Sequence, residues 1–141
     1  MEYKRFGSHA IVRMDPGEEL LEQLAVVAGK EKLRLASVSG LGAVNDFTVC
    51  VYKTAEKQYL SKRFTGAFEI VSLTGTVTTK DGAFYPHLHM SAGNERGAVF
   101  GGHLNRAVVS ATAELVLTLI DGTVERRFDE TIGLNLMRFE D

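Results

Sequence analysis

The sequence lacks several features that would assign the chain to a specialised class. Its 141 residues include a single cysteine, Cys50, so no disulfide can form within the chain and a reducing compartment is expected. No apolar run approaches the ~18 residues needed to span a bilayer, and the first residues include no apolar signal region. These absences predict a cytoplasmic protein that does not enter a membrane.

Clustered positive charge is also missing. The net charge is −2, whereas affinity for nucleic acid depends on grouped Lys and Arg side chains. The basic pairs are short, and we interpret them, Arg126 with Arg127 included, as solvated faces. Charge therefore gives no support to DNA binding.

What remains is the composition of an ordinary globular protein, with 45% hydrophobic and 24% charged residues. A chain of this length is most simply one domain covering residues 1–141.

One helix is predicted near the N-terminus. Asp15 is a candidate N-cap, Pro16 suits the first helical position, and the acidic residues that follow favour the positive end of the helix dipole. Apolar residues then recur at helical spacing until Gly29, where we expect the helix to end.

The rest of the chain has the pattern of β-strands. Asp81-Gly82 indicates a hairpin between residues 69–79 and the segment from His87, and Asp121-Gly122 indicates a second hairpin between residues 108–120 and 124–128. Repeated helices between strands are absent, which argues against a doubly wound sheet. The predicted fold class is α+β, a mainly antiparallel sheet of about seven strands with one main helix.

Three of the four histidines lie within 17 residues, as His87, His89 and His103. On a strand, His87 and His89 would project from the same face, about two rises of ~3.3 Å apart. His103 could complete a set of three nitrogen ligands, and three protein ligands with an open position are typical of exchangeable zinc sites. The other interpretation is that these are structural histidines satisfied by hydrogen bonds.

Two further residues are candidates for a supporting role. Glu69, at the head of an apolar strand, could orient a ligand histidine or act on metal-bound water, or it could instead form a hydrogen bond or a subunit contact. Ser91 continues the histidine face and could bond a ligand or a backbone group.

Three blocks of the sequence resemble the plants-and-prokaryotes conserved (PPC) domain. They are residues 66–75, Pro86-His-Leu-His-Met-Ser91, and Gly101-Gly-His-Leu104 leading into residues 112–116. The Ser39-Gly-Leu-Gly-Ala43 segment is similar as well. The resemblance covers nearly the whole chain.

The resemblance implies an α+β domain that assembles as a homotrimer and holds zinc, or another divalent transition metal, on residues matching His87, His89 and His103. In plant relatives, DNA is reached through an AT-hook, an element that this chain does not contain. The segment matching Gly66 and Phe68 to Val71 (Phe68, Glu69, Ile70 and Val71) contacts protein partners in those relatives.

Besides a purely structural interaction module whose sheet face assembles with itself, two functions stay open at the level of sequence. The first is a stand-alone PPC-domain protein, a metal-binding homotrimer with a regulatory or DNA-associated role. The second is a metal-dependent enzyme, a hydrolase or lyase acting on an unknown small molecule. Because no catalytic set beyond the histidines can be recognised, we favour the first.

Overall fold

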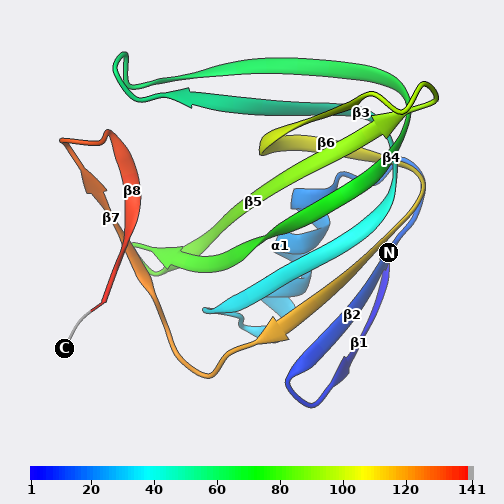
Figure 1. The fold of residues 1–141 in the computed structure, drawn as a ribbon. Coiled ribbons are helices and arrows are strands. Elements are labelled where there is room, and N and C mark those ends of the chain that lie inside the picture. The colour runs from blue at the N-terminus through cyan, green and yellow to red at the C-terminus, as the bar shows by residue number, and fades with distance from the viewer. Residues whose placement is uncertain (140–141) are drawn as a thin grey trace.

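The computed structural model describes residues 1–139 and has eight strands and one helix (Figure 1). In chain order these are β1 (Glu2–Phe6), β2 (His9–Met14), α1 (Leu20–Glu31), β3 (Ala36–Lys53), β4 (Gln58–Lys80), β5 (Ala83–Asn94), β6 (Val99–Leu119), β7 (Glu125–Asp129) and β8 (Leu134–Arg138). All strand pairs are antiparallel except β4 with β7. The predicted α+β class, with one helix and a mainly antiparallel sheet, is confirmed.

Four strands close into a ring. β6 pairs with β3, β3 with β4, β4 with β5, and β5 returns to β6. The closure is possible because β3, β4 and β6 are long and change register at bulges, and bulges bend a strand and increase its twist. β2 and β1 extend the sheet beyond β6.

The hairpin between β4 and β5 forms as its sequence predicts. Asp81 and Gly82 are the only residues between Lys80 and its partner Ala83, with φ angles of 53° and 76°. Positive φ at both central positions is the geometry of a type I′ turn, whose twist matches that of the two strands. This turn fixes the register that later sets the position of the histidines.

The core lies between the sheet and α1. The buried residues of β5 and β6 alternate along each strand, for example Leu88 with Met90 and Leu115 with Leu117. α1 presents Leu20, among others, to the same core and lies across the back of the sheet in Figure 1. Within residues 1–139, no helix is both long and apolar enough to cross a membrane.

The start of α1 differs from the prediction. The helix begins at Leu20 and its N-cap is Glu19, whose carboxylate accepts from the backbone N–H of Glu22 at 2.8 Å. Asp15 is not the N-cap, because its carboxylate accepts from the amino group of Met1 at 2.7 Å and from Arg13 at 3.0 Å.

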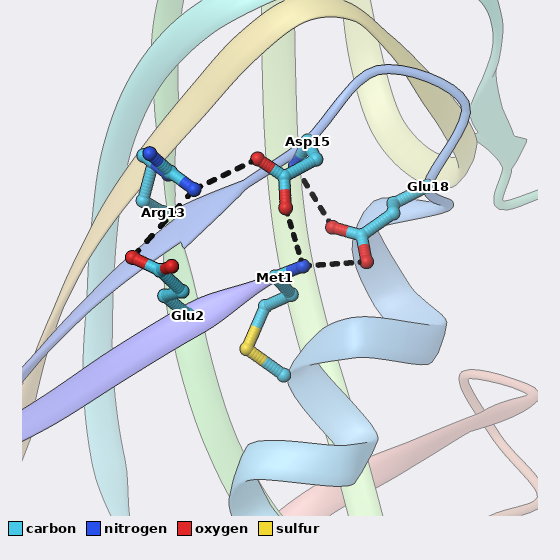
Figure 2. A network of polar contacts seen from close by, with 5 residues as sticks. All are labelled: Met1, Glu2, Arg13, Asp15 and Glu18. Atoms are coloured by element: carbon cyan, nitrogen blue, oxygen red, sulfur yellow. Dashed lines mark hydrogen bonds and ion pairs between the residues drawn. The ribbon is translucent and has the colours of Figure 1, made fainter.

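The N-terminus is held by a small network of charges (Figure 2). The amino group of Met1 lies between the carboxylates of Asp15 and Glu18, at 2.7 and 2.8 Å. Arg13 joins Asp15 to Glu2 of the neighbouring strand. The network ties β1 to the segment that leads into α1.

The predicted hairpin between residues 108–120 and 124–128 is wrong. β7 instead pairs with β8 and makes one parallel bridge to β4, between Glu125 and Thr79. The reason is that the end of β6 has no free edge, since Thr118 pairs with His9 of β2 on one side and with Ser37 of β3 on the other. The chain must therefore turn away from β6, and β7 and β8 stand apart from the other strands in Figure 1, joined to them by the single bridge to β4.

Candidate metal centre

Two neighbouring strands bring the three histidines together. His87 and His89 lie on β5, and His103 on β6 is the direct ladder partner of His89. Leu88, between the first two histidines, and Leu104, after the third, are buried, so the imidazoles project from the face that lies away from the core. His89 is exposed and the other two are half-buried.

The three rings are close enough to share one ion. Their centroids lie 5.1 Å (His87 to His103), 5.4 Å (His87 to His89) and 5.6 Å (His89 to His103) apart. One nitrogen from each ring lies within 4.8 Å of the others. Nitrogens that each bind a zinc ion at about 2.0–2.1 Å are necessarily within about 4.2 Å of one another, so only small side-chain adjustments are needed.

The surroundings of His87 and His103 favour the uncharged form of both imidazoles. Burial, together with the neighbouring His103, Arg126 and His89, lowers the pKa of His87 to about 4. Burial and His89 also lower the pKa of His103. Since a metal binds only neutral imidazole, these residues are in the form that a ligand requires.

Close backbone packing positions the two strands. A Cβ added to Gly75 on β4 would meet the backbone of His87 and lie 2.6 Å from the Cα of Leu88. A Cβ on Gly102 would lie 2.6 Å from the carbonyl oxygen of Cys50. Only glycine allows these approaches without moving a strand that bears a histidine.

Arg126 approaches the cluster from β7. Its Nη2 lies 3.4 Å from Nδ1 of His87, Nε donates to the hydroxyl of Thr78 at 2.8 Å, and Nη1 donates to the carbonyl of Asn135 at 2.9 Å. The guanidinium also lies 4.9 Å from the ring centre of Tyr85. The expectation that Arg126 is solvated is wrong, since only 5% of the residue is exposed and burial lowers its pKa.

Two tyrosines, Tyr59 and Tyr52, extend the site on the side of His103. The ring of Tyr59, on β4, lies 5.2 Å from His103, and Tyr52, on β3, lies 5.0 Å from Tyr59. The hydroxyl of Tyr52 donates to the carbonyl of Ile132 at 2.7 Å, which joins the end of the β3–β4 hairpin to the loop between β7 and β8. The histidines thus have neighbours from β3, β4 and β7.

Glu69 is not brought to the histidines. It pairs with Gly93, whereas His89 pairs with Thr74. Five positions along β4 separate Glu69 from Thr74, on the order of 16 Å at ~3.3 Å per residue. Ser91 is nearer, two positions beyond His89 on the same face of β5 and opposite Gly101 of β6.

The segment that contacts protein partners in plant relatives lies on β4, away from the histidines. Phe68 and Ile70 are buried, while Gly66 and Glu69 are exposed. Val71 is 63% exposed and falls where the register with β5 shifts. Glu69 and Val71 help to line a surface hollow of about 620 Å³, which lies at the junction of β3, β4, β5 and β6.

Sequence reasoning did not find Arg126, Tyr59 or Tyr85. Arg126 is separated from His87 by 39 residues, and its pattern with Arg127 is that of an ordinary surface pair. In the structure the two arginines differ, because Arg126 is buried and Arg127 is exposed, and no local sequence signal distinguishes them.

Comparison with known proteins gives one family. The model of the Plants and Prokaryotes Conserved domain, abbreviated PCC or PPC, matches residues 1–121. The match includes all three histidines and ends before β7, so Arg126 lies outside it.

Individual relatives agree with this match. A solved "putative dna binding protein" from Bacteroides thetaiotaomicron is 27% identical, with a TM-score of 0.96 over 99% of this chain and 98% of that one. A metal-containing protein from Archaeoglobus fulgidus is 34% identical, with a TM-score of 0.87 over 98% and 97%. A bifunctional protein GlmU from a Synechococcus strain is 31% identical over 119 residues, which are 83% of this chain and 17% of that protein. The chain thus spans about a sixth of the length of the curated relative that it matches.

Proposed function

The chain belongs to the Plants and Prokaryotes Conserved domain family, and from that premise we propose that it is a metal-binding member whose His87, His89 and His103 hold zinc. The observation that carries the proposal is the convergence of three ligand nitrogens within 4.8 Å. The metal-containing relative from Archaeoglobus fulgidus supports it. Imidazole also suits nickel, copper and iron, so the experiment has to identify the metal.

The residues of the site would both bind a metal ion and fix the position of its ligands. The three imidazoles would bind the metal in their neutral form, and the ladder pairing of His89 with His103 holds two of them in position. When bound, the metal would supply a positive charge and a coordination position for water or another ligand.

Elemental analysis of the purified, tag-free protein tests the proposal, with the His87→Ala/His89→Ala double variant beside it. We expect about one metal ion per wild-type chain and none in the variant. His9→Ala is the matched control, because His9 is an exposed histidine on β2 outside the cluster. A wild-type protein without metal after zinc has been supplied would overturn the proposal.

We further propose that the protein works as a homotrimer, as its family resemblance implies. The exposed Glu69 and Val71, beside the hollow at the strand junction, are the residues we assign to contacts between subunits or with a protein partner. Phe68 and Ile70 would support that surface from the core. Light scattering should give three times the chain mass of 15.5 kDa, and a single-chain mass would exclude the trimer.

A regulatory, DNA-associated role is the function we connect with this assembly. It is supported by the Bacteroides relative, which bears the name of a DNA-binding protein. The net charge of −2 does not support direct binding, so any contact with DNA would be weak and salt-sensitive. In a gel-shift experiment, a protein that does not shift a DNA duplex at low salt would exclude the DNA-associated role but not the metal site or the trimer.

A metal-dependent enzyme, a hydrolase or lyase acting on a small molecule, is the second candidate. The observation that favours it is the open position left by three histidine ligands on an accessible face of the sheet, where metal-bound water can reach a pKa near ~7. Loss of turnover together with metal in His89→Ala would distinguish this function from a structural role.

We also propose that residues 1–141 form one domain and that it resides in the cytoplasm. The single free cysteine, which is buried, agrees with a reducing compartment. One core cluster joins α1 to the ring of strands, in keeping with a single folding unit.

A further inference from the structure

Arg126 is a buried cation without a counter-ion in the part of the chain that the structure describes. Its polar partners are the Thr78 hydroxyl, the Asn135 carbonyl and a ring nitrogen of His87, all of them uncharged. None of the ion pairs found there includes it. Because burying an unpaired charge is costly, arginines are rarely this deeply buried without a carboxylate.

A purely structural role explains the contacts of Arg126 but not its charge. The side chain does connect β7 to β4 through Thr78, and it packs against Tyr85. A well-packed neutral side chain of similar size could make that connection without the desolvation penalty. A positive charge at this point therefore suggests a negatively charged partner that is not part of the chain.

The histidine cluster also points to a negatively charged partner from outside the chain. Three neutral imidazoles bring no negative charge to a divalent metal, and among residues 1–139 the cluster of possible ligands includes no Asp or Glu. With Arg126 beside His87, a bound metal would add to a positive charge that forms no ion pair with an acidic side chain of residues 1–139. Opposite charges attract strongly in partly buried sites, so the site favours an anion.

We propose that Arg126 and the metal held by the three histidines together bind a small oxyanion group, a carboxylate or a phosphate, of the natural ligand. The inference rests on the proposed metal site and adds the charge class of its ligand. Guanidinium N–H groups donate to both kinds of oxyanion in short, charge-assisted hydrogen bonds. Nη2 of Arg126 is the nitrogen that faces the cluster, while Nε and Nη1 are held by Thr78 and Asn135.

Arg126 lies outside the segment of the chain that the family model matches. The family model ends at residue 121, and β7 begins at Glu125. The metal ligands would thus come from the segment shared with the family, whereas the anion-recognising residue would come from the hairpin that follows it.

The test uses the full chain loaded with cobalt(II) in place of zinc, because the visible absorption of cobalt reports a change in its ligands. We expect acetate to cause a saturable change in the wild type. Arg126→Gln should lower the affinity for acetate at least tenfold while the metal content stays the same. Arg127→Gln is the matched control, since Arg127 is the next residue of β7 and is exposed, and it should leave the affinity unchanged.

Inorganic phosphate is the second probe. Tighter binding of acetate would assign a carboxylate ligand, and tighter binding of phosphate a phosphate ligand. No spectral change with either anion, or equal affinities in the wild type and a metal-loaded Arg126→Gln variant, would overturn the inference. A wild type that binds no metal would instead refute the proposed metal site. Elemental analysis measures the metal content independently of anion binding.

If Arg126→Gln does not fold, a second variant still tests the inference. Arg126→Lys keeps the charge but loses the planar fork of donors. We expect it to bind acetate at least threefold more weakly than the wild type, and an unchanged affinity would overturn the inference.

Discussion

His89 and His103 are direct partners in the ladder between β5 and β6, with ring centroids 5.6 Å apart and ring planes at 89°. The two residues come from strands joined by a short loop, so their separation is set by backbone pairing rather than by side-chain contacts. His87, two residues before His89, completes the cluster on the same face. The spacing of the three histidines is therefore set by the backbone pairing of β5 with β6 and by the alternation of side chains along β5.

The first prediction concerns the loss of one ligand. His103→Ala removes the histidine that β6 contributes, and we expect zinc affinity to fall at least about 100-fold, since groups that only orient ligands already account for about 10–100-fold. Competition with a chromophoric chelator measures the change. His9→Ala should bind zinc as the wild type does, and an unchanged affinity in His103→Ala would remove this residue from the site.

The second prediction concerns the packing of β4 against β5. Gly75→Ala places a methyl group against the backbone of His87 and Leu88, so we expect a loss of stability of about 1–3 kcal/mol, together with weaker metal binding. Urea unfolding and metal content measure the two effects. Gly29→Ala, in α1 with open space around the added Cβ, should stabilise the protein by about 0.5–1 kcal/mol. Equal stability of Gly75→Ala and the wild type would contradict the packing described for this strand pair.

The third prediction concerns acid stability through Asp46. Hydrogen bonds from Arg63 and Arg106, which outweigh the effect of burial, lower the pKa of Asp46 to about 2. A depressed folded-state pKa stabilises the protein above the unfolded pKa of about 4, and this contribution is lost as the pH falls toward 2. Asp46→Asn should therefore have a lower urea midpoint than the wild type at pH 7, and the difference should shrink near pH 2.

A matched exposed carboxylate serves as the control for Asp46. Glu56 pairs with Lys53 at the surface, with about half of each side chain exposed, so Glu56→Gln should change the midpoint little at either pH. A pH-independent effect of Asp46→Asn would show that the carboxylate acts through its shape and not through its charge.

The fourth prediction concerns the amino group of Met1. Hydrogen bonds to Asp15 and Glu18 raise its pKa above 8.0. A raised folded-state pKa stabilises the protein fully below the unfolded pKa of about 8, and the contribution is lost as the pH rises through the folded-state value. We expect the melting temperature of protein with a free Met1 amino group to fall as the pH rises above about 8.

The double variant Asp15→Asn/Glu18→Gln tests the cause of that fall. It should melt lower than the wild type at pH 7.5, with a smaller further loss at higher pH. The same pH dependence in both proteins would mean that another group is responsible.

Local signals predicted the parts of the fold that local physics controls. The Asp81-Gly82 turn, the helix after Pro16 and the alternation of His87 and His89 were all readable from the sequence. That His103 would lie beside His89 was a hypothesis, because the ladder that joins them depends on the loop between β5 and β6.

The parts that could not be predicted depend on which sheet edges are free. Asp121-Gly122 has the residues of a hairpin turn, but both edges of β6 are already paired at Thr118, so the chain has to turn away from β6. The same displacement carries Arg126 to His87. No local pattern encodes that contact, so the sequence alone predicts a solvated Arg126, the charged residue that the structure places beside His87.

The closed ring of strands limits how copies of this protein can associate. His89 is paired with Thr74 on one side and with His103 on the other, and His103 is in turn paired with Cys50. No strand of a second molecule can therefore hydrogen-bond to the backbone at these positions, whereas β1 and β8 lie at the outer ends of the sheet order. Strand addition at those ends would leave the backbone around the two histidines the same in the isolated chain and in the assembly.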